Sequence, residues 1–208
     1  MRSRLPGSMV GLAVLLCLAW WGVPRNPVRD RPRKPLVDRP GSSSNVELAN
    51  LFEADQKDRD NCTNWGFMDQ LCVGARDSDR RKRAAEMISQ GLVKTGEDHY
   101  RAAFLFQHGS SAEDYRRAHE LALKAADLDY RAARWLAAAT EDRWLVSQGK
   151  HQKWGTQARI FPDGRVNILP VDPAVTDAQR VAMDCPPLAD APARIREKYG
   201  LPTPGGKP

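Results

Sequence analysis

The stretch Tyr130–Gln148, YRAARWLAAATEDRWLVSQ, is the strongest helix signal in the sequence and decides the fold class. Gly149 follows it directly and is a residue at which helices commonly end. At 3.6 residues per turn, Trp135, Ala139 and Asp142 fall on one otherwise apolar stripe. Because burying a lone charge is costly, we expect Asp142 to have a cationic or hydrogen-bonding partner, or to be protonated.

Similar patterns predict four more helices on the N-terminal side of this stretch. They are expected at 46–60, from Asp77 or Ser78 to Leu92, from Asp98 to Gly109, and after a capping box formed by Ser111 and Asp114. Residues 61–74 read as irregular.

The period changes on the C-terminal side. Residues 157–161 and 165–169 flank a Pro-Asp-Gly turn and predict a short β-hairpin. A short helix is expected at 193–199, and 201–208 reads as a flexible tail. The sequence therefore predicts a mainly α protein: a single helical domain over 46–200, with about five helices and a short C-terminal β-hairpin, behind an N-terminal hydrophobic segment.

That segment, residues 1–23, reads as a signal peptide or a short membrane anchor. Arg2 and Arg4 precede the uncharged run 9–23, which is short for a membrane span. No Ala-x-Ala-like cleavage site follows the run, and basic residues come after it, so the topology stays open. Residues 24–45 form a Pro/Arg-rich linker. We expect a location at the cell envelope, with membrane association through 9–23 and the linker.

The charge distribution argues against nucleic acid as a partner. The formal net charge is +6, but residues 1–41 already contain eight basic and two acidic residues. The remaining chain is formally neutral, which is not the footprint of a nucleic-acid binder.

The cysteines leave two readings open. Cys62 and Cys72 are close enough in sequence to form a disulfide in an oxidising compartment, or these residues and Cys185 are three unrelated thiols. Their spacing matches no zinc motif.

Several helices direct polar groups into apolar stripes. Asp55 and Arg59 continue the stripe of Leu48, Leu51 and Phe52, and their i, i+4 spacing allows them to pair. His108 ends the apolar stripe of its own helix, where the helix dipole favours the protonated imidazole. These groups together predict a buried polar cluster.

Three kinds of chemistry fit this cluster. In the first it fixes helix register or shapes a small-ligand pocket. In the second His108 is a general acid/base oriented by Asp142 or Asp55, and Arg59 or Arg143 holds an anionic group. In the third His108, Asp55 and Asp142 bind a metal, although their spacing is not diagnostic. We commit to no catalytic residue and predict no metal.

The loop Gly149–Gln157, GKHQKWGTQ, is a candidate lining for the same pocket. Gln152, Thr156 and Gln157 offer amide and hydroxyl groups beside the predicted hairpin. The same groups could instead satisfy backbone atoms at the helix end. No phosphate loop, nucleophile elbow or metalloprotease motif is present, and we predict no cofactor.

Four motifs in order resemble a bacterial domain-of-unknown-function family that is marked by Asp-Gln-x-x-Arg and Tyr-Gly-Thr-Gln signatures. The matching motifs are Asp55-Gln56-x-x-Arg59, Gln107-His108, Asp142-Arg143 and Gly149-x-x-Gln152-x-x-Gly155-Thr156-Gln157, and Pro170-Val171, Val175 and Arg180 follow them. Trp154 stands where that family usually has Tyr. The resemblance covers roughly Glu53 to Leu188 and implies a helical domain with polar signature positions, without an established activity.

The leading hypothesis is therefore an exported or membrane-anchored helical domain whose buried polar cluster is structural or shapes a small-ligand pocket. The first alternative is a hydrolase-like enzyme that uses His108 with Asp142 or Asp55. The second is a helical scaffold that binds a partner along Trp135 and Trp144. Whether the chain is an enzyme, and which partner it binds, are left open.

Overall fold

The computed structural model describes residues 43–61, 67–161 and 164–201. The predicted leader 1–23, nearly all of the linker 24–45 and the tail after residue 201 lie outside these ranges. So does Cys62, and the side chain of Cys72 is not described, which leaves the Cys62–Cys72 disulfide a prediction.

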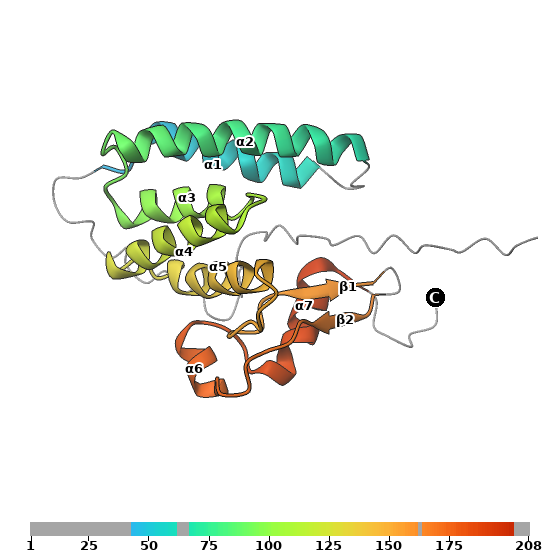
Figure 1. Ribbon diagram of the computed structural model, residues 1–208. Coiled ribbons are helices and arrows are strands. Elements are labelled where there is room, and N and C mark those ends of the chain that lie inside the picture. The colour runs from blue at the N-terminus through green and yellow to red at the C-terminus, as the bar shows by residue number, and fades with distance from the viewer. Residues whose placement is uncertain (1–42, 62–66, 162–163, 202–208) are drawn as a thin grey trace, which may run out of the picture.

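The fold is mainly helical, as the sequence predicts (Figure 1). The described residues contain seven α-helices where about five were expected: α1 (Val46–Asn61), α2 (Phe67–Ser89), α3 (Gly96–Phe106), α4 (Ala112–Asp127), α5 (Ala133–Ser147), α6 (Asp177–Ala182) and α7 (Ala191–Tyr199). No helix among the described residues is long and apolar enough to cross a membrane.

The prediction for α2 was wrong at its N-terminal end. Helix α2 starts at Phe67, whereas the sequence suggested an irregular segment over 61–74 and a helix start at Asp77 or Ser78. Asp77 is instead a buried residue in the helix interior, and its carboxylate pairs with Arg59 of α1. A residue typical of helix starts is used here for a contact between two helices.

The starts of α3 and α4 are set by capping boxes, in which the N-cap and the third helical residue bond each other's backbone N–H. Ser111 and Asp114 form the one predicted for α4. Helix α3 has a second, formed by Thr95 and Asp98, so Asp98 lies inside the helix rather than opening it. The Asp98 carboxylate also accepts from the Asn45 N–H at 2.7 Å, which ties the start of α1 to that of α3.

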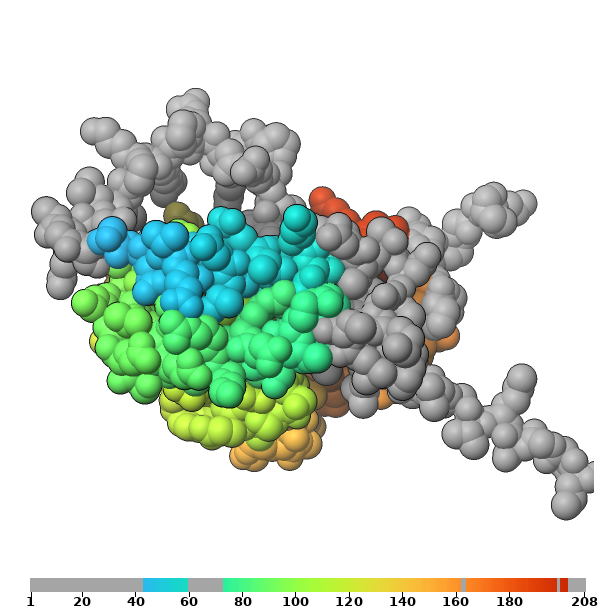
Figure 2. All heavy atoms as spheres, turned by 90° about the horizontal axis from the view of Figure 1, so that it is seen from above, coloured from blue at the N-terminus to red at the C-terminus, as the bar shows by residue number. Residues whose placement is uncertain are grey.

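The helices form layers around one apolar core. Helices α1 and α2 lie side by side on one face, as Figure 2 shows in blue to green, and α3 to α5 lie beneath them in Figure 1. Helices α3, α4 and α5 pack in succession through fully buried alanines, which allow close approach. Phe52 of α1 meets Phe104 of α3 with ring centroids 5.1 Å apart in an edge-on arrangement.

The C-terminal part contains the predicted β-hairpin. Strand β1 (Ala158–Ile160) pairs antiparallel with β2 (Val166–Ile168), and Arg159 lies opposite Asn167. Helix α6 and the 3-10 turn η1 (Leu188–Asp190) were not expected, and α7 begins two residues before the predicted helix at 193–199. Helix α7 packs against β2.

Candidate functional site

The predicted polar residues fall into two separate groups. The His108 centre consists of Asp55 and Arg59 of α1, Asp77 and Arg80 of α2, and His108, which follows α3. The Asp142 centre consists of Asp142 of α5 and the loop residues Gln152, Lys153, Trp154, Thr156 and Gln157. The structure thus brings Asp55, Arg59 and His108 together and places Asp142 with the loop.

Alternating charges hold the His108 centre together. Arg59 donates from Nη1 to Asp55 Oδ1 at 2.8 Å and from Nη2 to Asp77 Oδ2 at 2.7 Å. Arg80 donates from Nη1 to Asp77 Oδ1 at 3.0 Å. All four side chains are at least nine-tenths buried, so each carboxylate faces arginine instead of water. This confirms the expected pairing of Asp55 with Arg59.

The ring of His108 lies next to Asp55. Its Nε2 is 3.6 Å from Asp55 Oδ2, which is beyond hydrogen-bond length, and 4% of the side chain is exposed. Burial lowers the pKa of His108 well below its ordinary value, and the charges of Arg59, Arg143, Arg81 and Arg80 lower the pKa further. The expectation of a protonated imidazole was therefore wrong.

Besides burial, nearby arginines oppose the effect of the helix dipole on this ring. Arg143 Nη1 donates to the carbonyl oxygen of Gln107 at 2.7 Å, and Arg81 Nη1 donates to that of His108 at 2.9 Å. The carbonyl groups at this end of α3 thus already face the positive charge of arginines. His108 was expected to supply this charge.

The pKa of Asp55 is shifted in the opposite direction to that of His108. Burial raises the pKa of Asp55 to about 7, the negative charge of Asp77 raises it as well, and Arg59 and Arg80 oppose both effects. The Asp55 carboxylate therefore titrates near neutral pH beside a neutral imidazole, a combination found more often at functional sites than elsewhere.

Three polar side-chain atoms in this region are buried without a hydrogen-bond partner among the described residues. They are Arg59 Nε, Gln107 Nε2 and His108 Nε2. Arg59 and His108 both lie against Asp55, and Gln107 precedes His108 in the chain. An unsatisfied buried polar atom costs roughly 1–3 kcal/mol, so this end of the helical layers retains unused hydrogen-bonding capacity.

The Asp142 centre is fully satisfied by comparison. Asp142 Oδ1 accepts from the backbone N–H groups of Lys153 at 2.7 Å and Trp154 at 2.9 Å. Oδ2 accepts from Thr156 N at 2.9 Å and Thr156 Oγ1 at 2.8 Å. Burial raises the pKa of Asp142, and these four bonds oppose the rise. The expected hydrogen-bonding partner of Asp142 is thus the loop.

The two glutamines brace the same loop internally. Fully buried Gln152 donates from Nε2 to the carbonyl oxygens of Gln157 and Leu169, at 2.9 and 2.8 Å, and accepts from Gln157 N at 2.8 Å. Gln157 Nε2 donates to the carbonyl oxygen of Ala139 at 3.2 Å. Both amides, predicted as binding groups, are engaged in fixing the loop between α5 and the hairpin.

Trp154, which stands where the resembled family usually has Tyr, makes a polar contact. Its indole Nε1 donates to Glu141 Oε2 at 2.8 Å. Trp135 and Trp144 are each partly buried, so the reading of a partner-binding scaffold stays a prediction.

The candidate metal site and the cysteine Cys185 are less suited to function. Among the described residues no group of three or more His, Cys, Asp and Glu side chains is placed to hold a metal ion, and the three proposed ligands are divided between the two centres. Cys185 is a buried free thiol, and burial raises its pKa to about 12, which makes it a poor nucleophile.

Sequence reasoning missed Asp77, Arg80 and Gln107. The first two were detectable, because Val73, Asp77, Arg80, Ala84 and Met87 follow one another at alternating spacings of four and three residues and all are buried. The only sequence signal for Gln107 was its position next to His108 in the Gln107-His108 motif.

Comparison of the chain with protein-family models, with curated proteins and with solved structures finds no match in any of the three.

Replacing Asp142 with Asn should lower the free energy of unfolding by about 2–4 kcal/mol, because an amide NH2 would face loop donors in a buried site. Urea unfolding of the full chain measures this. The matched control is Glu141→Gln, which alters a neighbouring, more accessible carboxylate with contacts to the same loop, and should cost less than about 1 kcal/mol. Equal losses in the two variants would contradict the central role of Asp142.

The two pKa shifts in the His108 centre predict opposite pH dependences. Because the folded-state pKa of His108 is lowered, its contribution to stability is present above pH 6.5 and falls on acidification. Because that of Asp55 is raised to about 7, its contribution is lost as pH rises from about 4 through 7. As the pH falls from 7 to 5, the free energy of unfolding of His108→Gln should therefore rise relative to that of the unaltered chain. That of Asp55→Asn should fall relative to it.

Each difference is at most about 1.4 kcal/mol per pH unit. Urea unfolding at a series of pH values gives both slopes, and His151→Gln, an exposed histidine, is the control. Parallel curves for the Asp55 and His108 variants would show that neither group titrates as stated.

Proposed function

We propose that this chain is a cell-envelope domain that binds a small polar ligand at the His108 centre. The observation that carries the proposal is a pair of buried atoms beside Asp55, Arg59 Nε and His108 Nε2, that have no hydrogen-bond partner among the described residues. Buried polar atoms are normally hydrogen-bonded, so buried donors and acceptors left without a partner among the described residues are suited to a ligand. The fully bonded Asp142 centre, in contrast, is suited to holding the fold.

The chemistry of the centre favours a ligand rich in hydrogen-bond acceptors. Arg59 Nε and Gln107 Nε2 can only donate. Burial is the main cause of the lowered pKa of His108, and the charges of four arginines around the ring lower this pKa further. A phosphate, a carboxylate or a polarised carbonyl group would match these donors.

A second candidate is hydrolase-like catalysis at the same centre. It is favoured by the 3.6 Å separation between His108 Nε2 and Asp55 Oδ2 and by the pKa of Asp55 near 7. In this reading neutral His108 is the general base and Asp55 exchanges a proton near neutral pH. The 4% exposure of the His108 side chain demands that a substrate reach a buried ring, which ranks this candidate second.

The cell-envelope part of the proposal comes from the N-terminal sequence. An uncharged run at 9–23 follows Arg2 and Arg4, and the Pro/Arg-rich linker separates it from the helical domain. The resemblance of four motifs to those of a bacterial family is the ground for proposing a bacterial origin.

In a bacterial host the full chain should therefore fractionate with the envelope, and a variant lacking residues 1–23 should stay in the cytosol. Immunoblots of separated fractions measure the distribution. Recovery of the full chain in the cytosolic fraction would contradict export and anchoring alike.

Ligand binding is tested with inorganic phosphate as the probe. Phosphate should move the imidazole ¹⁵N resonances of His108 saturably in the full chain, and those of exposed His151 should not follow the same curve. Arg59→Lys removes the Nε donor but keeps the charge, and should weaken binding by about tenfold. Arg76→Lys changes a half-exposed arginine of α2 and should bind as the unaltered chain does.

A His108 signal that does not respond to phosphate, or an unchanged affinity in Arg59→Lys, would overturn the binding proposal. The second candidate is tested by the hydrolysis of p-nitrophenyl acetate. If the centre is catalytic, His108→Gln should slow hydrolysis by about a hundredfold, with Arg76→Lys unaffected. Hydrolysis no faster than in buffer would eliminate that candidate and leave the binding proposal standing.

A further inference from the structure

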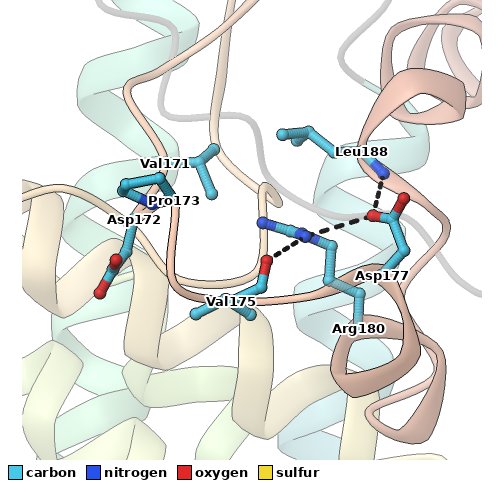
Figure 3. A pocket seen from close by; sticks show the side chains of 7 residues that line it. All are labelled: Val171, Asp172, Pro173, Val175, Asp177, Arg180 and Leu188. Carbon is cyan, nitrogen blue, oxygen red and sulfur yellow. Dashed lines mark hydrogen bonds and ion pairs between the residues drawn. The ribbon is translucent and has the colours of Figure 1, made fainter.

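A pocket of about 380 Å³ lies beside the Asp142 centre, between the segment that follows the hairpin and α6 (Figure 3). Its lining has an apolar part made of Val171, Pro173, Val175 and Leu188, with Arg180 among them. Its size is near the lower end of the range for small-molecule sites, and its lining combines these apolar side chains with three charged residues, Arg180, Asp172 and Asp177.

The conformation of the loop keeps this pocket in shape. Gly155 has a φ of +78°, and a Cβ at this position would approach Leu188 Cδ1 to 2.8 Å. Leu188 can therefore reach its place in the pocket lining only because residue 155 has no side chain. Gly155 lies between Trp154 and Thr156, whose N–H groups Asp142 holds.

Arg180 has an incompletely used guanidinium in this pocket. Its Nη1 donates to the Val175 carbonyl oxygen at 2.6 Å and to Asp177 Oδ1 at 3.2 Å. Its Nη2 reaches the Lys153 carbonyl oxygen only at 3.5 Å, and its Nε is buried without a partner among the described residues. The side chain is 4% exposed, so water does not compensate for the missing partner.

Figure 3 shows the Arg180 side chain extending from α6 into the lining, between Leu188 and Val175, toward Val171. Asp177 neutralises the charge weakly, because its side chain is 55% exposed and its Oδ1 also accepts from Leu188 N at 2.9 Å. The side chain of Asp172 points away from the guanidinium in the same view.

We propose that this pocket is a binding site for a small carboxylic acid with a branched apolar group. The Arg180 guanidinium, which lines the pocket, is the group that would pair with the carboxylate, and Val171, Val175 and Leu188 receive the apolar group. A purely structural Arg180 accounts for the two Nη1 bonds that tie Val175 to α6, but it leaves Nε without a function.

The test uses the full chain with methyl-labelled Leu and Val, and 3-methylbutanoate as the probe. The methyl resonances of Leu188, Val171 and Val175 should move saturably. The neutral amide of the same acid keeps the shape but loses the charge, and should bind about tenfold more weakly. Acetate keeps the carboxylate but lacks the branched group, and should also bind more weakly.

Two variants separate the parts of the site. Arg180→Lys should lose most of the preference for acid over amide, and Leu188→Ala should lose most of the preference for 3-methylbutanoate over acetate. N-acetylvaline distinguishes the source of the carboxylate: tighter binding than 3-methylbutanoate assigns a peptide chain end, and weaker binding assigns a free acid, both within the proposal.

Equal affinity for acid and amide in the unaltered chain overturns the proposal without any variant. An absence of saturable shifts at these methyl groups overturns it too. The imidazole signal of His108 reports on the other site, so failure here and failure of the phosphate experiment are distinguishable.

Discussion

The carboxylate of Asp142 is the constraint on which the C-terminal half of the structure depends. A fully buried anion must be surrounded by donors, and here four hydrogen bonds come from Lys153, Trp154 and Thr156. The loop must fold back over α5 to supply them. This fixes where the hairpin begins and presents Gly155 to Leu188. The pocket around Arg180 is thus built on the same electrostatic requirement.

The His108 centre meets the same requirement in a different way. Its carboxylates are balanced by arginine side chains, which bring several donors each, and Arg59 Nε is left without a partner among the described residues. Asp142, surrounded by backbone donors, has no hydrogen-bonding capacity to spare. The contrast between a satisfied and an unsatisfied buried centre is the physical reason for assigning structure to one and binding to the other.

Local periodicity predicted which residues would be buried but not what they would meet. The stripes through Asp55, Arg59 and Asp142 were correct, and so was the capping box of Ser111. Asp77 was misassigned because a helix cap is a local signal, whereas its partner Arg59 lies 18 residues away. The predicted protonation of His108 was wrong for a similar reason, since the burial of the ring and the arginines of α1, α2 and α5 that lower its pKa are not local to its helix. The sequence held no local signal for the unused edge of Arg180.

Helix α5 relates the two polar centres through two adjacent residues. Asp142 accepts hydrogen bonds from the loop, and Arg143 donates to the carbonyl oxygen of Gln107, one residue before His108. Consecutive residues of an α-helix point about 100° apart, so α5 presents Asp142 to the loop and Arg143 to the end of α3. That guanidinium also helps to keep the imidazole neutral. Helix α5 therefore contributes one residue to each centre: Asp142 positions the loop, and Arg143 is one of the groups that lower the pKa of His108.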